Sequence, residues 1–353
     1  MVISVFEYTA KEYLKMENKC VLPFINHDYQ SDSPCCLLKN FKTSRDIEQL
    51  LEDHSNNRRS KFCVDCWKTE DRAMESKRHI SNQSYKDNLA QTEREISTAV
   101  IPVGNVCNLY CITCQPRYST SWLKKYEQMY PGMPYNKTEI STGIKVSDLQ
   151  GIDKFQHIEF IGGETLKSAS LWKYLATLDK KKSFSLQTNG TAELTQKQTE
   201  LLASFKNVNI CFSLDGHGKI FEYMRQPAKW DKVRQNIKQF IKHFGINRLS
   251  TYVTVSNLNI LYIDEIVLNI FKILPSRIML NLVHTPVEFA YNNLGKHIGK
   301  VVEKKNPGFF KKNNIEWCGD LSSSKLTLDN LKKQDKFSKL KLQEHLPELF
   351  SLL

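Results

Sequence analysis

Residues 104–122 read GNVCNLYCITCQPRYSTSW and place Cys107, Cys111 and Cys114 in the spacing C-x3-C-x2-C. A [4Fe–4S] cluster is normally held by four cysteines, so three on one loop leave one iron open to a small chelating ligand. A structural zinc site usually joins two short ligand pairs from separate places in the chain, and a compact triplet fits that pattern poorly. The spacing therefore favours an iron–sulfur cluster with one open position. A structural zinc or a reactive thiol loop is the alternative.

The composition is that of an ordinary globular protein, with 353 residues of which 41% are hydrophobic and 25% charged. This length suits one large domain or about two to three smaller ones. No apolar run approaches the roughly 18 residues of a membrane span, and the first residues lack the features of a signal peptide. We therefore expect a cytoplasmic protein without membrane contact.

The cysteines and the charge bear on possible ligands. Ten cysteines in a reducing compartment do not fit a disulfide framework, and the close pairs Cys35–Cys36 and Cys63–Cys66 indicate metal binding. The formal charge of +12 favours an acidic partner such as a nucleic acid. Because the lysines are spread widely, we favour a solvated surface and keep a nucleic-acid partner as an alternative.

From residue 97 onward, short β-rich runs alternate with longer amphipathic stretches, which is typical of βα units around a parallel sheet. The predicted strands are 98–103, 157–162, 184–189, 208–214, 249–255 and 277–283. The predicted helices are 119–130, 168–180, 195–204, 229–244 and 262–273. Six strands are too few for a closed eight-stranded barrel, so the pattern predicts an α/β fold with a partial, open (β/α)6 barrel. We expect three domains, namely a Cys-rich domain over 1–95, the barrel over 96–290 and a helical extension over 291–353.

The cysteine triplet follows the first predicted strand of this barrel, and ligand sites in parallel sheets lie at the carboxyl ends of strands. At this point the sequence resembles the radical S-adenosylmethionine (SAM) superfamily. The resemblance implies a [4Fe–4S] cluster on Cys107, Cys111 and Cys114 whose open iron binds SAM. An electron from the cluster then cleaves SAM, and the resulting 5′-deoxyadenosyl radical abstracts hydrogen from a substrate.

Further motifs follow at the ends of later predicted strands. The second strand ends in IGGET, which resembles the family's GGE-Pro motif but has Thr165 in place of proline. The third ends in QTNG, and the fourth in SLDG followed by an arginine. The resemblance assigns SAM binding to these motifs, and an ordinary strand-end turn is the alternative for the first two. The SAM-binding residues implied are Gly162, Gly163, Glu164, Gln187, Asn189, Ser213 and Arg225.

Two polar residues at strand ends, Asp215 and His284, are weak candidates for proton transfer near the substrate. A structural role as hydrogen-bonding residues is the favoured interpretation for both. Of the remaining cysteines, Cys211 lies within an apolar strand and is expected in the core, and Cys318 is isolated.

The N-terminal cysteines form a second group, with PCC at 34–36 and FCVDC at 62–66. This region resembles the twitch or SPASM-like auxiliary-cluster region, with one cysteine before an apolar-aromatic strand and a later C-x2-C. Here it precedes the barrel, as in one known group of twitch-domain proteins. The resemblance implies an auxiliary [4Fe–4S] cluster held by Cys20, Cys63 and Cys66 with either Cys35 or Cys36. A zinc site on the same cysteines is the alternative, because both metals accept sulfur ligands.

The resemblance thus implies a radical SAM oxidoreductase or transferase. We expect a peptide or protein side chain as substrate and a flavodoxin- or ferredoxin-type electron donor. The alternatives are a radical SAM enzyme acting on a small molecule or nucleic acid, and a non-catalytic zinc protein that binds nucleic acid.

Overall fold

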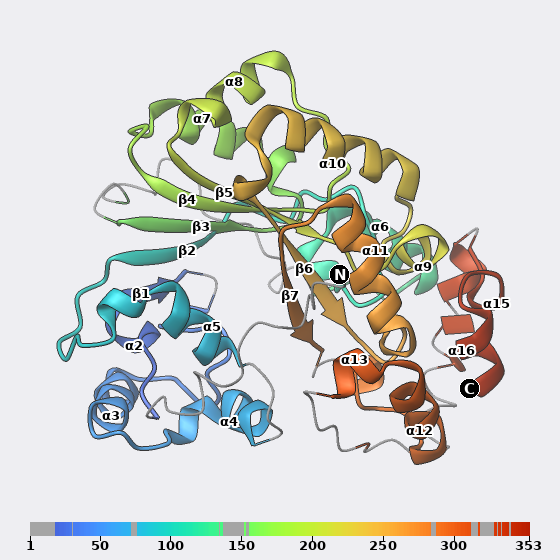
Figure 1. Cartoon of the computed structure of the whole chain (residues 1–353), viewed down its shortest axis with the longest axis horizontal. Helices are drawn as coiled ribbons and strands as arrows, with labels where there is room; N and C mark the ends of the chain where they lie inside the picture. The colour runs from blue at the N-terminus through green and yellow to red at the C-terminus, as the bar shows by residue number, and fades with distance from the viewer. Residues whose placement is uncertain are drawn as a thin grey trace.

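The computed structural model contains one parallel sheet that curls into a half-barrel (Figure 1). Strands adjacent in sequence are also adjacent in the sheet, from β1 to β7. The residues that the structure describes are 18–29, 31–71, 76–133, 135–136, 152, 155–283, 287–311, 317, 328–329, 331–332, 334–338 and 340–353.

Seven strands form this sheet in the described part of the chain. They are β1 (Asn26–Asp28), β2 (Thr98–Pro102), β3 (His157–Ile161), β4 (Ser183–Thr188), β5 (Asn207–Ser213), β6 (Leu249–Val255) and β7 (Arg277–Leu282). All six strands predicted from the sequence are confirmed. The seventh, β1, lies before residue 97, so the sheet has one strand more than the six predicted from that residue onward. It comes from the Cys-rich region and pairs in parallel with β2, with Asn26 opposite Thr98.

The helices include the five predicted from the sequence and several others. They are α2 (Leu22–Ile25), α3 (Ser44–Ser55), α4 (Val64–Glu70), α5 (Lys77–Ser84), α6 (Thr120–Met129), α7 (Ala169–Thr177), α8 (Gln196–Ser204), α9 (Gly218–Met224), α10 (Trp230–Phe244), α11 (Ile263–Ile273), α12 (Lys296–Lys305), α13 (Pro307–Phe310), α15 (Leu342–His345) and α16 (Pro347–Leu352). Helices α7, α8 and α10 lie over one side of the sheet, and α2 to α5 gather near its other end (Figure 1).

The strand predicted after Cys20 forms mostly as the short helix α2. Pro23 stands in the first turn of α2, where its missing N–H and fixed φ suit a helix start. Extended backbone begins only at Asn26. The apolar side chains of α2 are buried, and α2 therefore helps to anchor the Cys-rich region.

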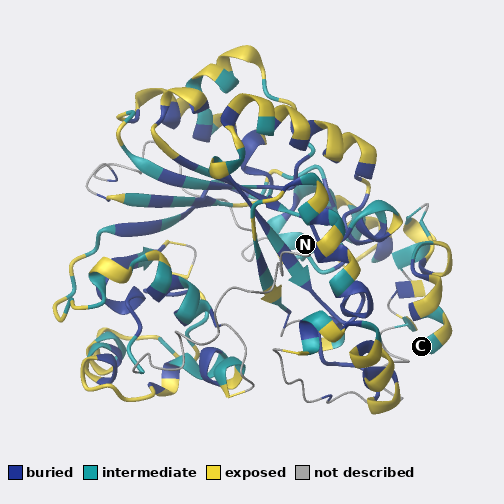
Figure 2. Cartoon of the chain, in the orientation of Figure 1, coloured by how far each residue is buried: buried dark blue, intermediate teal, exposed yellow. Residues whose placement is uncertain are grey.

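The two faces of the sheet differ in polarity because side chains alternate along each strand. In β4, Phe184 and Leu186 are fully buried, and rings of Phe160 and Phe205 pack edge-on against Phe184 at 5.9 and 4.8 Å. The intervening residues of β4 are polar and only half-buried. Buried residues follow the sheet and the inner faces of the helices, while exposed residues lie on the outer faces (Figure 2). The helix-covered face is thus the core, and the concave face is left for polar groups.

No helix within the described ranges combines the length and the apolar character needed to cross a membrane.

Candidate functional site

The cysteine triplet lies on the loop that joins β2 to α6, at the carboxyl end of the sheet. The three thiols act on one another electrostatically. Burial raises the pKa of Cys114 to about 12, and Cys107 adds to that rise. The loop therefore gathers three thiols in a partly buried place.

The first turn of α6 holds this loop. The carbonyl oxygen of Cys107 accepts hydrogen bonds from the hydroxyls of Thr120 and Ser121, at 3.0 and 2.8 Å. Trp122 Nε1 donates to the carbonyl oxygen of Cys111 at 2.8 Å. Sequence reasoning did not assign a role to these residues, although they lie in the run STSW at 119–122, shortly after the triplet. They fix the backbone of the loop rather than the thiols.

The predicted GGE motif lies against the same loop. Gly163 N–H donates to Gly104 O at 2.9 Å, and Glu164 N–H donates to Val106 O at 2.8 Å. A Cβ atom on Gly163 would lie 2.6 Å from Val106 O, and one on Gly162 would lie 2.5 Å from Gly104 O. The glycines are therefore needed for close approach between the end of β3 and the cysteine loop.

The Glu164 carboxylate is almost fully buried, with 1% of the residue exposed. One oxygen accepts hydrogen bonds from Thr188 Oγ1 at 2.8 Å and from Leu166 N at 3.2 Å, and the other accepts from Asn189 N at 2.6 Å. Burial raises the pKa of Glu164, and these hydrogen bonds oppose the rise. Glu164 thus links the ends of β3 and β4 beneath the loop.

The other predicted SAM-binding residues divide between two places. Asn189 Nδ2 lies 3.9 Å from Cys107 Sγ and 3.3 Å from Asn108 Oδ1, so Asn189 lies beside the cysteine loop. Gln187 instead donates to Glu159 Oε1 at 2.8 Å. Both Gln187 and Ser213 line a cavity on the concave face of the sheet.

Asp215 and Arg225 form a buried ion pair, with Nε and Oδ2 2.8 Å apart and side chains 2% and 10% exposed. The N–H bond of Nε is not aimed at the oxygen, so the contact is an ion pair rather than a well-aligned hydrogen bond. Asp215 Oδ1 accepts from Thr254 N at 2.8 Å. Burial raises the pKa of Cys111 and Cys114, and nearby Arg225 opposes that rise, which places the guanidinium near both thiols.

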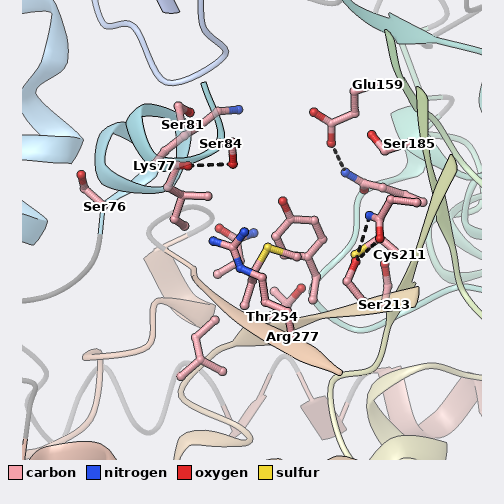
Figure 3. A pocket seen from close by; sticks show the side chains of 18 of the residues that line it. Ser76, Lys77, Ser81, Ser84, Glu159, Ser185, Cys211, Ser213, Thr254 and Arg277 are labelled. Atoms are coloured by element: carbon pink, nitrogen blue, oxygen red, sulfur yellow. Dashed lines mark hydrogen bonds between the residues drawn. The ribbon is translucent and has the colours of Figure 1, made fainter. Parts of the chain in front are cut away.

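The cavity has a volume of about 820 Å³ and is lined by β3 to β7 together with α4 and α5. Its walls are rich in hydroxyl, amide and charged groups, as Figure 3 shows for side chains such as Lys77, Glu159, Ser213 and Arg277. Cys211, expected in the core, is buried but also reaches this wall. The concave face and the Cys-rich region thus line one half-open cavity, called here the polar chamber.

In the Cys-rich region, the thiols of Cys20, Cys63 and Cys66 interact electrostatically. Burial raises the pKa of Cys63, and Cys20 and Cys66 add to the rise. The Cys20 thiol accepts a hydrogen bond from the backbone of Leu22, and the Cys66 thiol accepts one from the backbone of Arg78. N–H groups directed at sulfur stabilise thiolates, which are the form that binds metal.

The neighbouring cysteines Cys35 and Cys36 differ from each other. Cys35 is buried and packs with Cys20 and Leu22, whereas Cys36 is exposed and its thiol lies 3.3 Å from Lys77 Nζ. A hydrogen bond from Cys35 lowers the pKa of Cys36 to about 6. Cys36 therefore interacts with a cation at the chamber wall.

The residues present fit a sulfur-ligated metal group, because soft thiols gather at both places with N–H or cationic partners. No three His, Cys, Asp or Glu side chains within the described ranges surround one point closely enough to hold a single ion. A [4Fe–4S] cluster binds each thiolate through a different iron, so its ligands stand farther apart than those of one ion. Two residues considered above, His284 and Cys318, lie outside the described residues.

No family model matches the chain, and no curated protein matches it significantly. Solved structures with some likeness include anSMEcpe with bound AdoMet, which is 16% identical with a TM-score of 0.40 over 62% of this chain and 62% of that chain. Streptococcus suis SuiB bound to S-adenosylmethionine is 13% identical with a TM-score of 0.41 over 79% of this chain and 67% of that chain. SuiB also occurs bound to the precursor peptide SuiA. The chain spans 62% of the anSMEcpe chain. Solved structures this distant do not show which ligand the chain binds or which reaction it catalyses. Both must be inferred from the residues of the chain itself.

Proposed function

We propose that the chain is a radical SAM enzyme that binds a [4Fe–4S] cluster through Cys107, Cys111 and Cys114 and acts on a peptide or protein side chain. When bound, the cluster and SAM supply reductive cleavage of SAM to a 5′-deoxyadenosyl radical, which removes a hydrogen atom from the substrate. The observation that carries the proposal is that the cysteine loop is hydrogen-bonded to the residues on both sides of Arg225, which pairs with buried Asp215. Tyr110 N donates to Gln226 O at 2.7 Å, and Ile112 N donates to Met224 O at 3.0 Å.

Arg225 has the position and charge to serve this site. Its guanidinium opposes the rise in pKa of all three thiols, which favours their charged, metal-binding form. A guanidinium also binds a carboxylate through paired N–H groups, and SAM carries a carboxylate. Thr254 N–H donates to Asp215, and Asp215 in turn pairs with Arg225, so we assign Asp215 as a positioning residue.

The GGE segment supports the opposite side of the proposed SAM site. Gly162 and Gly163 bring the end of β3 against the cysteine loop, and Glu164 joins that end to β4. Each carboxylate oxygen has two lone pairs, so Glu164 retains acceptor capacity for the ammonium group of SAM. We assign Asn189 to the same site because of its closeness to Cys107.

The polar chamber is the proposed substrate site, with Gln187 and Ser213 on its wall. A chamber of about 820 Å³ suits one or two residues of a polar peptide, since ligand sites commonly range from about 300 to 1,000 Å³. Its many hydroxyl and amide groups satisfy the polar backbone of a bound peptide. The chain's formal charge of +12 suits an acidic electron donor of the flavodoxin or ferredoxin type.

We further propose a second metal centre in the Cys-rich region, an auxiliary [4Fe–4S] cluster on Cys20, Cys63 and Cys66 with Cys35 or Cys36. The support is the grouping of the first three thiols and the backbone N–H groups directed at two of them. Four ligands would close this centre and suit electron transfer or a structural role.

The test is anaerobic reconstitution with iron and sulfide, followed by addition of dithionite and SAM. We expect about eight irons per chain from two four-iron clusters, and formation of 5′-deoxyadenosine. Replacing Cys107, Cys111 and Cys114 together by alanine should abolish this product and leave the spectrum of the N-terminal centre.

The control is Ser204→Ala, which changes an exposed residue at the end of α8 away from the cysteine loop and the polar chamber and should preserve SAM cleavage. A colourless protein that holds only zinc, binds nucleic acid and does not cleave SAM would support the rival zinc protein instead. Loss of both spectra in the triple variant would show that the ligands are wrongly assigned.

A further inference from the structure

Glu159 is a carboxylate on the wall of the polar chamber to which the proposed function gives no role. It stands in the middle of β3, where its neighbours Ile158 and Phe160 are fully buried in the core. Because side chains alternate along a strand, Glu159 faces the concave side of the sheet, where it lines the chamber. Figure 3 shows Glu159 reaching into the cavity from the β3 wall, whereas Lys77 comes from the wall formed by α5.

One oxygen of this carboxylate is held by the neighbouring strand. Gln187 Nε2, on β4, donates to Glu159 Oε1 at 2.8 Å. An amide is neutral, so this hydrogen bond orients the carboxylate without compensating its charge. Each carboxylate oxygen has two lone pairs, and the described residues therefore leave Oε2 and one lone pair of Oε1 to a ligand.

Glu159 differs in this respect from the other charged groups of the chamber. Asp65 Oδ2 pairs with Lys39 Nζ at 3.1 Å, and Lys77 Nζ lies 3.3 Å from Cys36 Sγ. No lysine, arginine or histidine within the described ranges forms an ion pair with Glu159. Withdrawing a carboxylate from water without a counter-charge is unfavourable, so the chamber wall favours a ligand that brings a cation to this point.

Two tyrosines border the same carboxylate. Burial raises the pKa of Tyr85 and of Tyr252, Glu159 adds to the rise and Lys77 opposes it, so both phenols lie within electrostatic reach of Glu159. Both line the chamber, and neither hydroxyl has a hydrogen-bond partner among the residues that the structure describes. Carboxylates, phenol oxygens and aromatic faces all attract an ammonium or guanidinium group. The three side chains thus offer the groups that such a cation needs.

Glu159 also lies on the strand that leads to the proposed SAM site. Gly162 of the GGE segment follows it by three residues, which is about 10 Å along extended backbone. The starts of β6 and β7 line the same chamber farther from that segment. A side chain held at Glu159 therefore lies between those strand starts and the segment that we assign to SAM.

We propose that Glu159 is a specificity residue of the chamber and that the substrate side chain it binds is cationic, as in lysine. Gln187 holds the carboxylate, and Tyr85 and Tyr252 border the bound cation. This inference rests on the chamber being the substrate site of the proposed function, and it adds the charge of the substrate.

The first test uses the full-length protein, reconstituted anaerobically with iron and sulfide, and needs no variant. Three capped tripeptides are compared by equilibrium dialysis without SAM: Gly-Lys-Gly, the same peptide with its lysine acetylated at the side-chain nitrogen, and Gly-Glu-Gly. The lysine peptide should bind about 10-fold more tightly than either other peptide, because a close, partly desolvated charge pair favours it. A preference for another peptide, equal binding by all three, or binding by none would overturn the inference.

The second test removes the charge of the carboxylate. Glu159→Gln keeps the size of the side chain and an oxygen for the Gln187 amide, and it should lower binding of the lysine peptide to the level of the acetylated one. The matched control is Glu200→Gln, since Glu200 Oε1 accepts from Gln196 Nε2 at the same distance of 2.8 Å on the exposed side of α8. The control should bind all three peptides as the unaltered protein does.

An unchanged preference for the lysine peptide in Glu159→Gln would show that the cation binds elsewhere and would overturn the inference. A folding defect cannot imitate the first test, because that test compares peptides on the unaltered protein. Neither test uses SAM. A protein that forms 5′-deoxyadenosine but lacks the preference refutes only this inference, whereas one that has the preference but does not cleave SAM refutes only the proposed function.

Discussion

The Asp215–Arg225 pair yields a prediction that follows directly from its burial. The change is Asp215→Asn, which keeps an oxygen for Thr254 N–H but replaces the charged oxygen facing Arg225 with a neutral amide. The guanidinium then remains buried without its counter-charge. The variant therefore isolates the loss of the ion pair from loss of side-chain volume.

Removing one partner of a buried ion pair costs about 3–5 kcal/mol, because the remaining charge is left desolvated. With side chains 2% and 10% exposed, we expect Asp215→Asn to lower the free energy of unfolding within that range. The double variant Asp215→Asn with Arg225→Met removes the stranded charge and should recover about 2 kcal/mol or more.

The assay is urea denaturation followed by circular dichroism, with the free energy of unfolding extrapolated to water. The matched control is Asp231→Asn, which breaks an exposed pair with Arg234 at 3.0 Å whose side chains are 77% and 46% exposed. That change should cost less than about 1 kcal/mol. The reasoning is refuted if Asp215→Asn costs no more than the control, or if the double variant is less stable than the single one.

Three further changes test other parts of the structure. Gly163→Ala places a methyl group 2.6 Å from Val106 O and should cost about 1–3 kcal/mol from overpacking, measured by thermal melting. An unchanged melting temperature would contradict the close approach. Burial lowers the pKa of His157 in the folded protein. Below about pH 6.5 the unfolded chain therefore binds more protons than the folded one. The free energy of unfolding should thus fall as the pH drops from about 7 to 5. His157→Gln should reduce the slope of the free energy of unfolding against pH by at most about 1.4 kcal/mol per pH unit. The measurement is urea denaturation at several pH values, and an unchanged slope would exclude His157 as the source of the pH dependence. Phe160→Ala removes a fully buried ring and should cost about 3–5 kcal/mol by urea denaturation, whereas a loss below about 1 kcal/mol would show that the core is looser than described.

The main strands were predictable because their residues have strong local preferences. Runs such as VNICFSL and LSTYVTV combine β-branched and aromatic residues over the length of a strand. The strand β1 was missed because Asn26–Asp28 has three polar residues and no such pattern. Its strand conformation comes from pairing with β2, about 70 residues away, where Tyr29 N also donates to Val100 O at 2.9 Å.

The positions of the candidate site residues were predictable where they depend on placement along a strand, and less so where they depend on side-chain direction. The cysteine triplet and the GGE turn follow β2 and β3 directly, and they meet in the structure. Gln187 and Asn189 come two residues apart, yet one turns toward Glu159 and the other toward Cys107, because β4 ends between them.

The pairing of β1 with β2 has a consequence for how the chain is divided in the laboratory. A protein cut just before β2 would expose the backbone edge of Thr98–Pro102, four of whose five residues are buried here. An uncovered apolar edge of a sheet is a template for association with other chains. The Cys-rich region therefore acts as a cover for the sheet edge as well as a holder of thiols. A shortened protein that aggregates would reveal the loss of this cover and would say nothing about the metal.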